Sequence, residues 1–135
     1  MYLKVLEGAR NPEIEAVEVV GRPALTTGAV DVLEADGYIL GTPASLGYMS
    51  GALKHFFDQI YYPCLDGTAR RPYGLYVHGN SDTVGAVRAV ESITTGLGWR
   101  RAQEPATVLG QPSQEDLDRC WELGAAMAAG LILED

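Results

Sequence analysis

The feature that most constrains the fold is a short apolar run that ends in a glycine-rich loop and leads into a helical pattern. The run covers residues 37–41, the loop is GTPASLGYMS at residues 41–50, and the helical pattern begins at Gly51. A strand, a loop and a helix in this order form half of a βαβ unit. Ligands of open α/β sheets bind outside the carboxyl ends of the strands, where such loops lie. The glycines and hydroxyl groups of this loop can bring backbone N–H groups close to a flat, polar-edged ligand.

Length and charge narrow the class of protein. The chain has 135 residues, which fits a single domain over residues 1–135, and its net charge is −8. This charge argues against nucleic acid and against anionic membranes as partners. No apolar run approaches the length of a membrane span, and no signal-peptide pattern is present. Cys64 and Cys120 are isolated, and no cluster of residues suggests a metal, so we expect a cytoplasmic protein with free thiols and no metal site.

Apolar periodicity predicts alternating helices and strands along the whole chain. Four strands are expected, over residues 16–20, 37–41, 73–78 and 105–109. Five helices alternate with them, and the first covers residues 1–10. The second follows Thr26 or Thr27 and has Val30 and Leu33 on its apolar face, and the third is capped by Ser50 and ended by Tyr62–Pro63. The fourth is capped by Asp82 or Thr83, and the fifth begins at a capping box of Ser113 and Asp116.

This alternation predicts an α/β fold, with a parallel sheet and helices on both of its faces. The order of elements has one irregularity, because the chain opens on a helix where such folds open on a strand. The sheet is therefore expected to lack its first strand.

The loop and the helix after it resemble a known family. The pattern G-T-P-x-x-x-G-x-M-S-G over residues 41–51, with Lys54 and Asp58 following, is similar to the third strand–loop–helix of flavodoxin-like proteins. The resemblance is strongest to NAD(P)H:quinone oxidoreductases of the tryptophan-repressor-binding-protein type and to NADPH-dependent FMN reductases. It extends through residues 73–99 and so covers the middle half of the chain. It implies a flavodoxin-like three-layer sandwich that holds FMN at the carboxyl edge of a sheet ordered 2-1-3-4-5.

The resemblance also implies site residues and partners. FMN is the expected cofactor, NAD(P)H the electron donor and a quinone or similar small molecule the acceptor, in a homodimer or tetramer. No residue is assigned a catalytic role, since the flavin carries the chemistry. His78 is expected to contact the cofactor, and its alternative interpretation is a polar residue that faces water at the end of its strand. The residues expected to contact the cofactor are Thr42, Pro43, Ala44, Ser45, Leu46, Gly47, Tyr48, Met49, Ser50, His78, Gly79, Asn80, Ser81 and Asp82.

One departure from the family concerns the amino terminus. Relatives begin with a central strand and a loop that binds the FMN phosphate, and neither precedes residues 1–10 here. A gene model that starts too late is the favoured explanation, and a rearranged sheet is the alternative. If these 135 residues fold as given, we expect four strands in the order 2-3-4-5. The triplet Thr26-Thr27-Gly28 is similar to a phosphate loop, but it follows a strand at which the family places no phosphate.

Three functions are compatible with this sequence. The first is an FMN-dependent NAD(P)H oxidoreductase that reduces a quinone. The second is a flavodoxin-type electron carrier, for which the charge of −8 suits a basic redox partner. The third is a flavodoxin-like scaffold without flavin, because the phosphate loop is absent. We favour the first.

Overall fold

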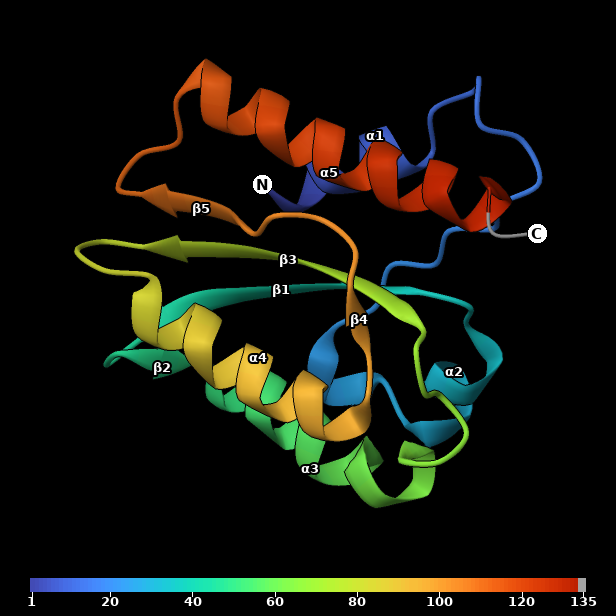
Figure 1. Cartoon of the computed structure of the whole chain (residues 1–135). Helices are drawn as coiled ribbons and strands as arrows, with labels where there is room; N and C mark the ends of the chain where they lie inside the picture. The colour runs from blue at the N-terminus through green and yellow to red at the C-terminus, as the bar shows by residue number, and fades with distance from the viewer. Residues whose placement is uncertain (134–135) are drawn as a thin grey trace.

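A computed structural model describes residues 1–133 and shows three layers, with a sheet between two layers of helices (Figure 1). Helices α1 and α5 cover one face of the sheet, and α2, α3 and α4 cover the other. The elements are α1 (Tyr2–Ala9), a 3-10 turn η1 (Ala24–Thr26), α2 (Ala29–Glu34), β1 (Tyr38–Ser45), β2 (Tyr48–Met49), α3 (Gly51–Cys64), β3 (Pro72–Gly79), α4 (Val84–Leu97), β4 (Arg100–Arg101), β5 (Ala106–Leu109) and α5 (Gln114–Leu133).

Strand β3 is the centre of the sheet. One of its edges pairs in parallel with β1, and residues Tyr38–Pro43 lie opposite Tyr73–His78. Its other edge pairs in parallel with β4 and then with β5. Strand β3 is buried along most of its length, which is typical of a strand covered by helices on both faces. The predicted α/β class and parallel sheet are confirmed.

Helix α3 supplies much of the larger half of the core. It begins where the sequence predicts, because the Ser50 hydroxyl oxygen accepts a hydrogen bond from the Leu53 N–H at 3.2 Å. The apolar residues of α3 recur at helical spacing and are buried against β1 and β3. The buried residues of this helix are Leu53, Phe56, Phe57, Ile60 and Cys64.

The opposite face of the sheet is closed by α5, on which α1 lies. Helix α5 begins with the predicted capping box, in which the Ser113 N–H donates to Asp116 and the Asp116 N–H donates to Ser113. Glycine makes the contact between the two helices close. A Cβ added at Gly124 would overlap the Val5 carbonyl oxygen, and one at Gly8 would overlap the Trp121 carbonyl oxygen. The helices therefore pack backbone against backbone.

The strand expected over residues 16–20 does not form. The expected order 2-3-4-5 is therefore wrong for strand 2, which was to be the edge strand of the sheet. Residues 17–20 are not assigned to any strand, and Ala16 has a φ of 70°, which interrupts an extended run. Among the described residues, residues 16–20 form no hydrogen bond with another backbone group, and the Val19 carbonyl accepts one from the Arg10 side chain at 2.9 Å. A β-branched run needs a neighbouring strand in order to form a strand itself, and among residues 1–133 none pairs with it. The remaining order, β1-β3-β5, is as predicted.

The predicted loop at residues 41–50 is largely a β-hairpin. Strand β1 continues to Ser45, and its last two residues pair antiparallel with β2. The connection is the pair Leu46 and Gly47, with φ values of 50° and 77°. Positive φ at both positions is the geometry of a type I′ turn, whose twist matches that of the flanking strands. The strand expected over residues 37–41 is thus longer than predicted.

We expect Leu46→Asn to raise the free energy of unfolding by about 0.5–1 kcal/mol. The Leu46 side chain is fully exposed, so the substitution removes no buried surface. Asparagine tolerates the left-handed conformation that leucine adopts here only at a cost. Urea unfolding measures the change, and Leu46→Ala is the control, because alanine keeps the strain and should change little. Equal effects of the two substitutions would contradict this interpretation of the turn.

Three smaller predictions are corrected. Helix α2 buries Val32, whereas Val30 and Leu33 are exposed, because six residues make too short a helix to define a face by spacing. Gly28, rather than a threonine, is its N-cap. Helix α3 passes through Pro63 and ends at Cys64.

Within the described residues, no helix combines the length and apolar character needed to cross a membrane.

Candidate functional site

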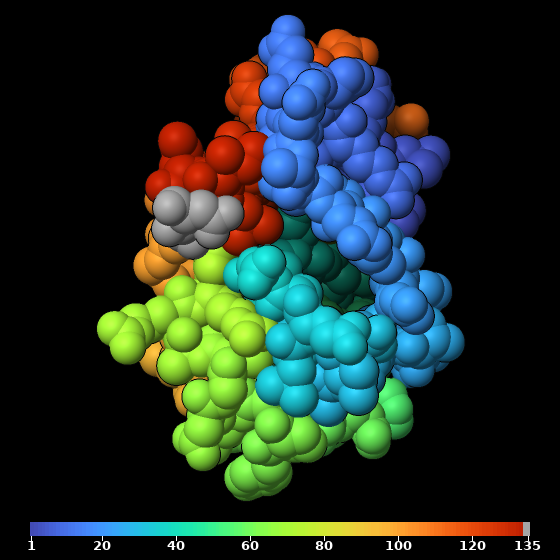
Figure 2. Space-filling view, turned by 90° about the vertical axis from the view of Figure 1, so that its right-hand side faces the viewer, coloured from blue at the N-terminus to red at the C-terminus, as the bar shows by residue number. Residues whose placement is uncertain are grey.

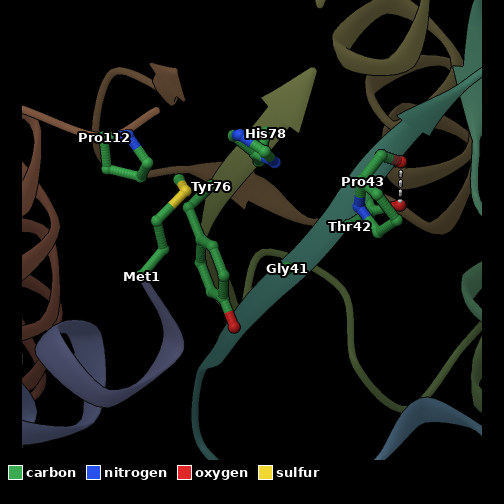
Figure 3. A pocket seen from close by; sticks show the side chains of 7 residues that line it. All are labelled: Met1, Gly41, Thr42, Pro43, Tyr76, His78 and Pro112. Carbon is green, nitrogen blue, oxygen red and sulfur yellow. Dashed lines mark hydrogen bonds between the residues drawn. The ribbon is translucent and has the colours of Figure 1, made fainter. Parts of the chain in front are cut away.

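The carboxyl ends of β1 and β3 form one wall of a pocket of about 390 Å³. Side chains alternate along parallel strands, so the residues that face α5 from β1 and β3 lie on one surface. The amino terminus of α1 and the loop after β5 complete the pocket, as Figure 3 shows. The lining residues are Met1, Gly41, Thr42, Pro43, Tyr76, His78 and Pro112.

Gly41 and Tyr76 define the floor of this pocket. The Tyr76 phenol lies directly over Gly41, and a Cβ at that position would overlap the ring (Figure 3). Because Gly41 has no side chain, the ring can lie against the backbone of β1. Here the pocket surface is aromatic, flat and half-buried.

His78 is a polar group of the pocket whose side chain has a defined orientation. Its Nε2 lies 2.6 Å from the Gly110 carbonyl oxygen. A carbonyl only accepts hydrogen bonds, so Nε2 donates, and Nδ1 of the neutral ring is left as an acceptor. The Gly110 N–H in turn donates to the Gly79 carbonyl, which ties the loop after β5 to the end of β3. The ring is therefore held in place by two adjacent strand ends.

Only some of the residues expected in the first loop line the pocket. Thr42 and Pro43 line the pocket, but the Thr42 hydroxyl is already engaged: it donates to the Pro43 carbonyl at 2.8 Å and accepts from the Ser50 N–H at 2.9 Å. Ser50 caps α3, and Met49 is buried in the core. The remaining expected residues, Ala44, Ser45, Leu46, Gly47 and Tyr48, form the hairpin beyond the pocket.

The second expected loop lies at the end of β3. His78 enters the pocket, whereas Gly79, Asn80, Ser81 and Asp82 are not among its lining residues. Asp82 instead accepts a hydrogen bond from the Val84 N–H, which stabilises the start of α4. A Cβ at Gly79 would lie 2.6 Å from the Asp82 carbonyl oxygen, so the turn closes tightly on itself.

Sequence reasoning did not include four of the lining residues. Tyr76 lies two residues before His78, so the period of a strand places both on one face, and this signal was available. Gly41 directly precedes the expected loop. Met1 and Pro112 are far away in the sequence, and no local pattern connects them to this site. Among the described residues, no group of three or more His, Cys, Asp or Glu side chains is arranged to hold a metal ion.

Burial raises the pKa of the Tyr76 phenol to about 12, and the nearby Tyr2 and Cys120 add to the effect. The phenol therefore ionises at higher pH in the folded protein than in the unfolded chain. The stability that it contributes is complete below about pH 10 and is lost as the pH rises toward 12.

We expect Tyr76→Phe to reduce the loss of stability between about pH 10 and about pH 12, since phenylalanine keeps the ring without the ionisable group. Urea unfolding at a series of pH values measures this difference. Tyr62→Phe is the control, because Tyr62 is 82% exposed and should leave the pH dependence unchanged. Parallel curves for the wild type and Tyr76→Phe would show that the phenol is not shielded from water.

The comparisons with known proteins identify the fold. No protein-family model and no curated protein matches this sequence. Among solved structures, a flavodoxin from the domain Archaea is similar with a TM-score of 0.80 and 14% identity, over 96% of this chain and 87% of that one. A WrbA-like flavodoxin from Agrobacterium tumefaciens is similar with a TM-score of 0.76 and 20% identity, over 98% and 88%.

A larger protein contains the same fold as one part. Rubredoxin oxygen:oxidoreductase from Desulfovibrio gigas is similar with a TM-score of 0.78 and 13% identity, over 98% of this chain and 33% of that protein. This chain thus spans about a third of the length of that enzyme. Together the three likenesses show that the chain has the flavodoxin-like fold, as the resemblance of residues 41–51 implied.

Proposed function

We propose that this protein is a redox protein that binds a flavin, FMN, at the carboxyl ends of β1 and β3. The observation that carries the proposal is the position of the pocket at this edge of a flavodoxin-like sheet, where α/β proteins bind their ligands. The volume of about 390 Å³ lies within the usual range of small-molecule sites. Proteins of similar structure are flavodoxins, a WrbA-like flavodoxin and flavodiiron proteins.

The pocket fits the ring of a flavin better than its phosphate. The Tyr76 ring over Gly41 offers a flat surface, and His78 Nδ1 and backbone groups offer polar contacts at its margin. No Lys or Arg lines the pocket among the described residues. The hydroxyls of Thr26 and Thr27 donate to the Pro23 carbonyl, so this triplet does not form a phosphate loop. The flavin ring therefore has candidate contacts here, whereas no Lys or Arg side chain of the described residues lines the pocket to meet the phosphate.

We propose as the specific activity the transfer of electrons from NAD(P)H to a quinone or similar acceptor. The flavin, when bound, supplies the redox chemistry. The residues of this chain would orient it, with His78 and the end of β1 at its edge and the aromatic floor beneath. Oxidation of NADH or NADPH in the presence of FMN and a benzoquinone, followed by absorbance, tests this activity.

A flavodoxin-type electron carrier is the second candidate, and one observation favours it. Four apolar side chains at the carboxyl edge of the sheet are more than 40% exposed, as a surface for a protein partner would be: Leu46, Tyr48, Val84 and Leu109. A carrier should show a stable one-electron reduced flavin and negligible NAD(P)H oxidation. Rapid turnover with NAD(P)H would exclude a carrier function.

The binding of FMN itself is tested by titrating FMN into the protein and following quenching of flavin fluorescence, with riboflavin in parallel. Equal quenching of the two would show that the protein holds the ring alone, as the pocket suggests. Stronger quenching of FMN would show a phosphate contact outside this pocket. No quenching of either would reject the proposed function and leave the flavin-free scaffold.

We expect His78→Ala to weaken flavin binding about tenfold, which corresponds to 1.4 kcal/mol. The ring of His78 lines the pocket, and its orientation is held by Gly110. The chain has one other histidine, His55, which is exposed on α3, so His55→Ala is a matched control that should bind flavin as the wild type does. Equal dissociation constants for the two variants would place the flavin elsewhere.

A further inference from the structure

The Gly110 carbonyl decides which nitrogen of His78 is left to meet a ligand. Nε2 donates to this carbonyl oxygen, and the two atoms lie 2.6 Å apart. Gly110 is itself held in place, because its N–H donates to the Gly79 carbonyl at 2.8 Å and its φ of 71° is a conformation that favours glycine. Nδ1 of the neutral ring therefore carries a lone pair and no hydrogen. Within residues 1–133, no group donates a hydrogen bond to Nδ1.

Other side chains of the pocket compete little with His78 for a polar ligand group. The Thr42 hydroxyl already donates to the Pro43 carbonyl and accepts from the Ser50 N–H. Tyr76 contributes an aromatic surface, as Figure 3 shows. Nδ1 of His78 is therefore a side-chain acceptor that the protein leaves for a ligand.

Arginine side chains gather at the opposite end of the sheet from this pocket. Arg70 and Arg71 directly precede β3, and Arg100 and Arg101 form β4, which pairs with the first two residues of β3. Figure 2 shows this end of the sheet, with the cyan segment that leads into β1 and the yellow-green segment that leads into β3. At the carboxyl ends, no Lys or Arg of the described residues lines the pocket. The polar contact that the pocket offers is therefore a neutral acceptor and not a positive charge.

We propose that His78 Nδ1 accepts a hydrogen bond from an imide N–H, the N3–H of an oxidised flavin ring, and so selects ligands that carry this group. The proposal rests on the proposed function, in which the pocket holds the ring of a flavin. The oxidised ring system has an N–H only at N3, whereas N1, N5 and both carbonyl oxygens accept hydrogen bonds. An acceptor such as Nδ1 cannot pair with another acceptor, so N3–H is the polar group of the ring that it can meet.

The walls of the pocket agree with this orientation of the ring. The N3–H lies at the polar end of a flavin, and the dimethylbenzene ring is the apolar end. His78 lies opposite Pro43 of β1, and Figure 3 shows the His78 ring between Pro43 and Pro112. Met1 and Tyr76 line the rest of the pocket with thioether and aromatic surface. With its imide end at His78, the flavin can place its apolar end against these side chains.

Two flavins that consist of the ring alone test the assignment in the wild-type protein. Lumiflavin has the N3–H, and N3-methyllumiflavin has a methyl group in its place. We expect the methylated flavin to bind at least tenfold more weakly, as measured by quenching of flavin fluorescence. Equal binding of the two would overturn the assignment and leave flavin binding intact. Binding of neither would reject the proposed function together with the assignment.

A third flavin examines the other edge of the ring. Deazalumiflavin, in which carbon replaces N5, keeps the N3–H and should bind as lumiflavin does. If deazalumiflavin bound more weakly and N3-methyllumiflavin did not, the ring would meet the protein through N5, contrary to the proposal.

The variant His78→Phe separates the role of His78 from a general steric effect of the methyl group. Phenylalanine keeps an aromatic ring but lacks Nδ1, so lumiflavin and N3-methyllumiflavin should bind to this variant with similar, weak affinity. His55→Phe is the matched control, because His55 is exposed on α3 and should leave the tenfold preference unchanged. A preference that persists in His78→Phe would show that another group meets the N3–H, and the proposal would be wrong.

Nitrogen NMR of the histidine rings gives a measurement that does not depend on affinity. In the free protein at neutral pH, we expect His78 to carry its hydrogen on Nε2 and none on Nδ1, with the His78 signals assigned by comparison with His55→Phe. Lumiflavin should shift the Nδ1 signal, and N3-methyllumiflavin should not. A hydrogen on Nδ1 in the free protein, or an Nδ1 signal that lumiflavin leaves unchanged while it binds, would overturn the proposal.

Discussion

Gly124→Ala is expected to lower the free energy of unfolding by about 2–3 kcal/mol, although alanine is the better helix former. Gly124 lies in the middle of α5, where a Cβ would overlap the carbonyl oxygen of Val5 in α1. The neighbour is backbone and cannot rotate away, so the two helices must separate. Their separation also loosens the contacts of Val5 with Cys120 and Leu123 in the smaller half of the core.

The control lies in the same helix. Gly130 is also in α5, and a Cβ there would meet no atom within 4 Å. Gly130→Ala should therefore raise the stability by about 0.5–1 kcal/mol, through helix propensity alone. Urea unfolding of both variants measures the contrast. If Gly124→Ala were as stable as Gly130→Ala, α1 would not be packed on α5 as the structure shows.

Gly85→Ala is the second substitution with a large expected effect. Gly85 is in the first turn of α4, and a Cβ there would overlap the carbonyl oxygen of Gly47, in the turn of the hairpin. We expect a loss of about 2–3 kcal/mol of stability, because the hairpin must move away from the helix. Since the hairpin continues β1, we also expect weaker binding of flavin in the adjacent pocket.

The matched control is Gly51→Ala, at the start of α3, where a Cβ would meet nothing within 4 Å. It should change the stability by no more than about 1 kcal/mol, in the stabilising direction. Hydrogen exchange of the Tyr48 and Met49 amides distinguishes a displaced hairpin from general destabilisation. Faster exchange at these amides than in β3 is the expected result for Gly85→Ala. Uniform acceleration would show that the contact with Gly47 is not specific.

Much of the fold was predictable because its signals are local. The apolar spacing of α3 and its cap at Ser50 depend only on residues within one helix. The same holds for the capping box at Ser113 and Asp116. The continuous apolar run of β3 indicates a strand covered on both faces wherever it lies. Each of these elements formed where it was expected.

The failures have a common cause, which is the dependence of a strand on its neighbour. The run at residues 16–20 has the β-branched composition of a strand, but no strand in the described part of the chain pairs with it, so it stays irregular. The loop at residues 41–50 has turn residues, but Ser45 and Tyr48 pair across the hairpin and extend β1. Composition alone does not say which edge of a strand will be occupied.

The candidate site divides in the same way. Thr42 and His78 were among the residues that the family resemblance implied, and the structure places both at the pocket. The engagement of the Thr42 hydroxyl with Ser50 was not predictable, because it depends on the hairpin bringing two residues eight positions apart together. Met1 and Pro112 join the pocket only because α1 and the loop after β5 pack at the same edge of the sheet.

By itself, then, the sequence determined the α/β class, the parallel direction of the main strands and the edge of the sheet at which the candidate pocket lies. These properties follow from periods, caps and the handed geometry of βαβ units, which are encoded over a few residues. Only the tertiary structure decided that Tyr76 lies over Gly41, that α1 meets α5 at Gly8 and Gly124, and that β1 extends into a hairpin with β2. These contacts join segments distant in the chain, and their geometry depends on the packing of whole layers.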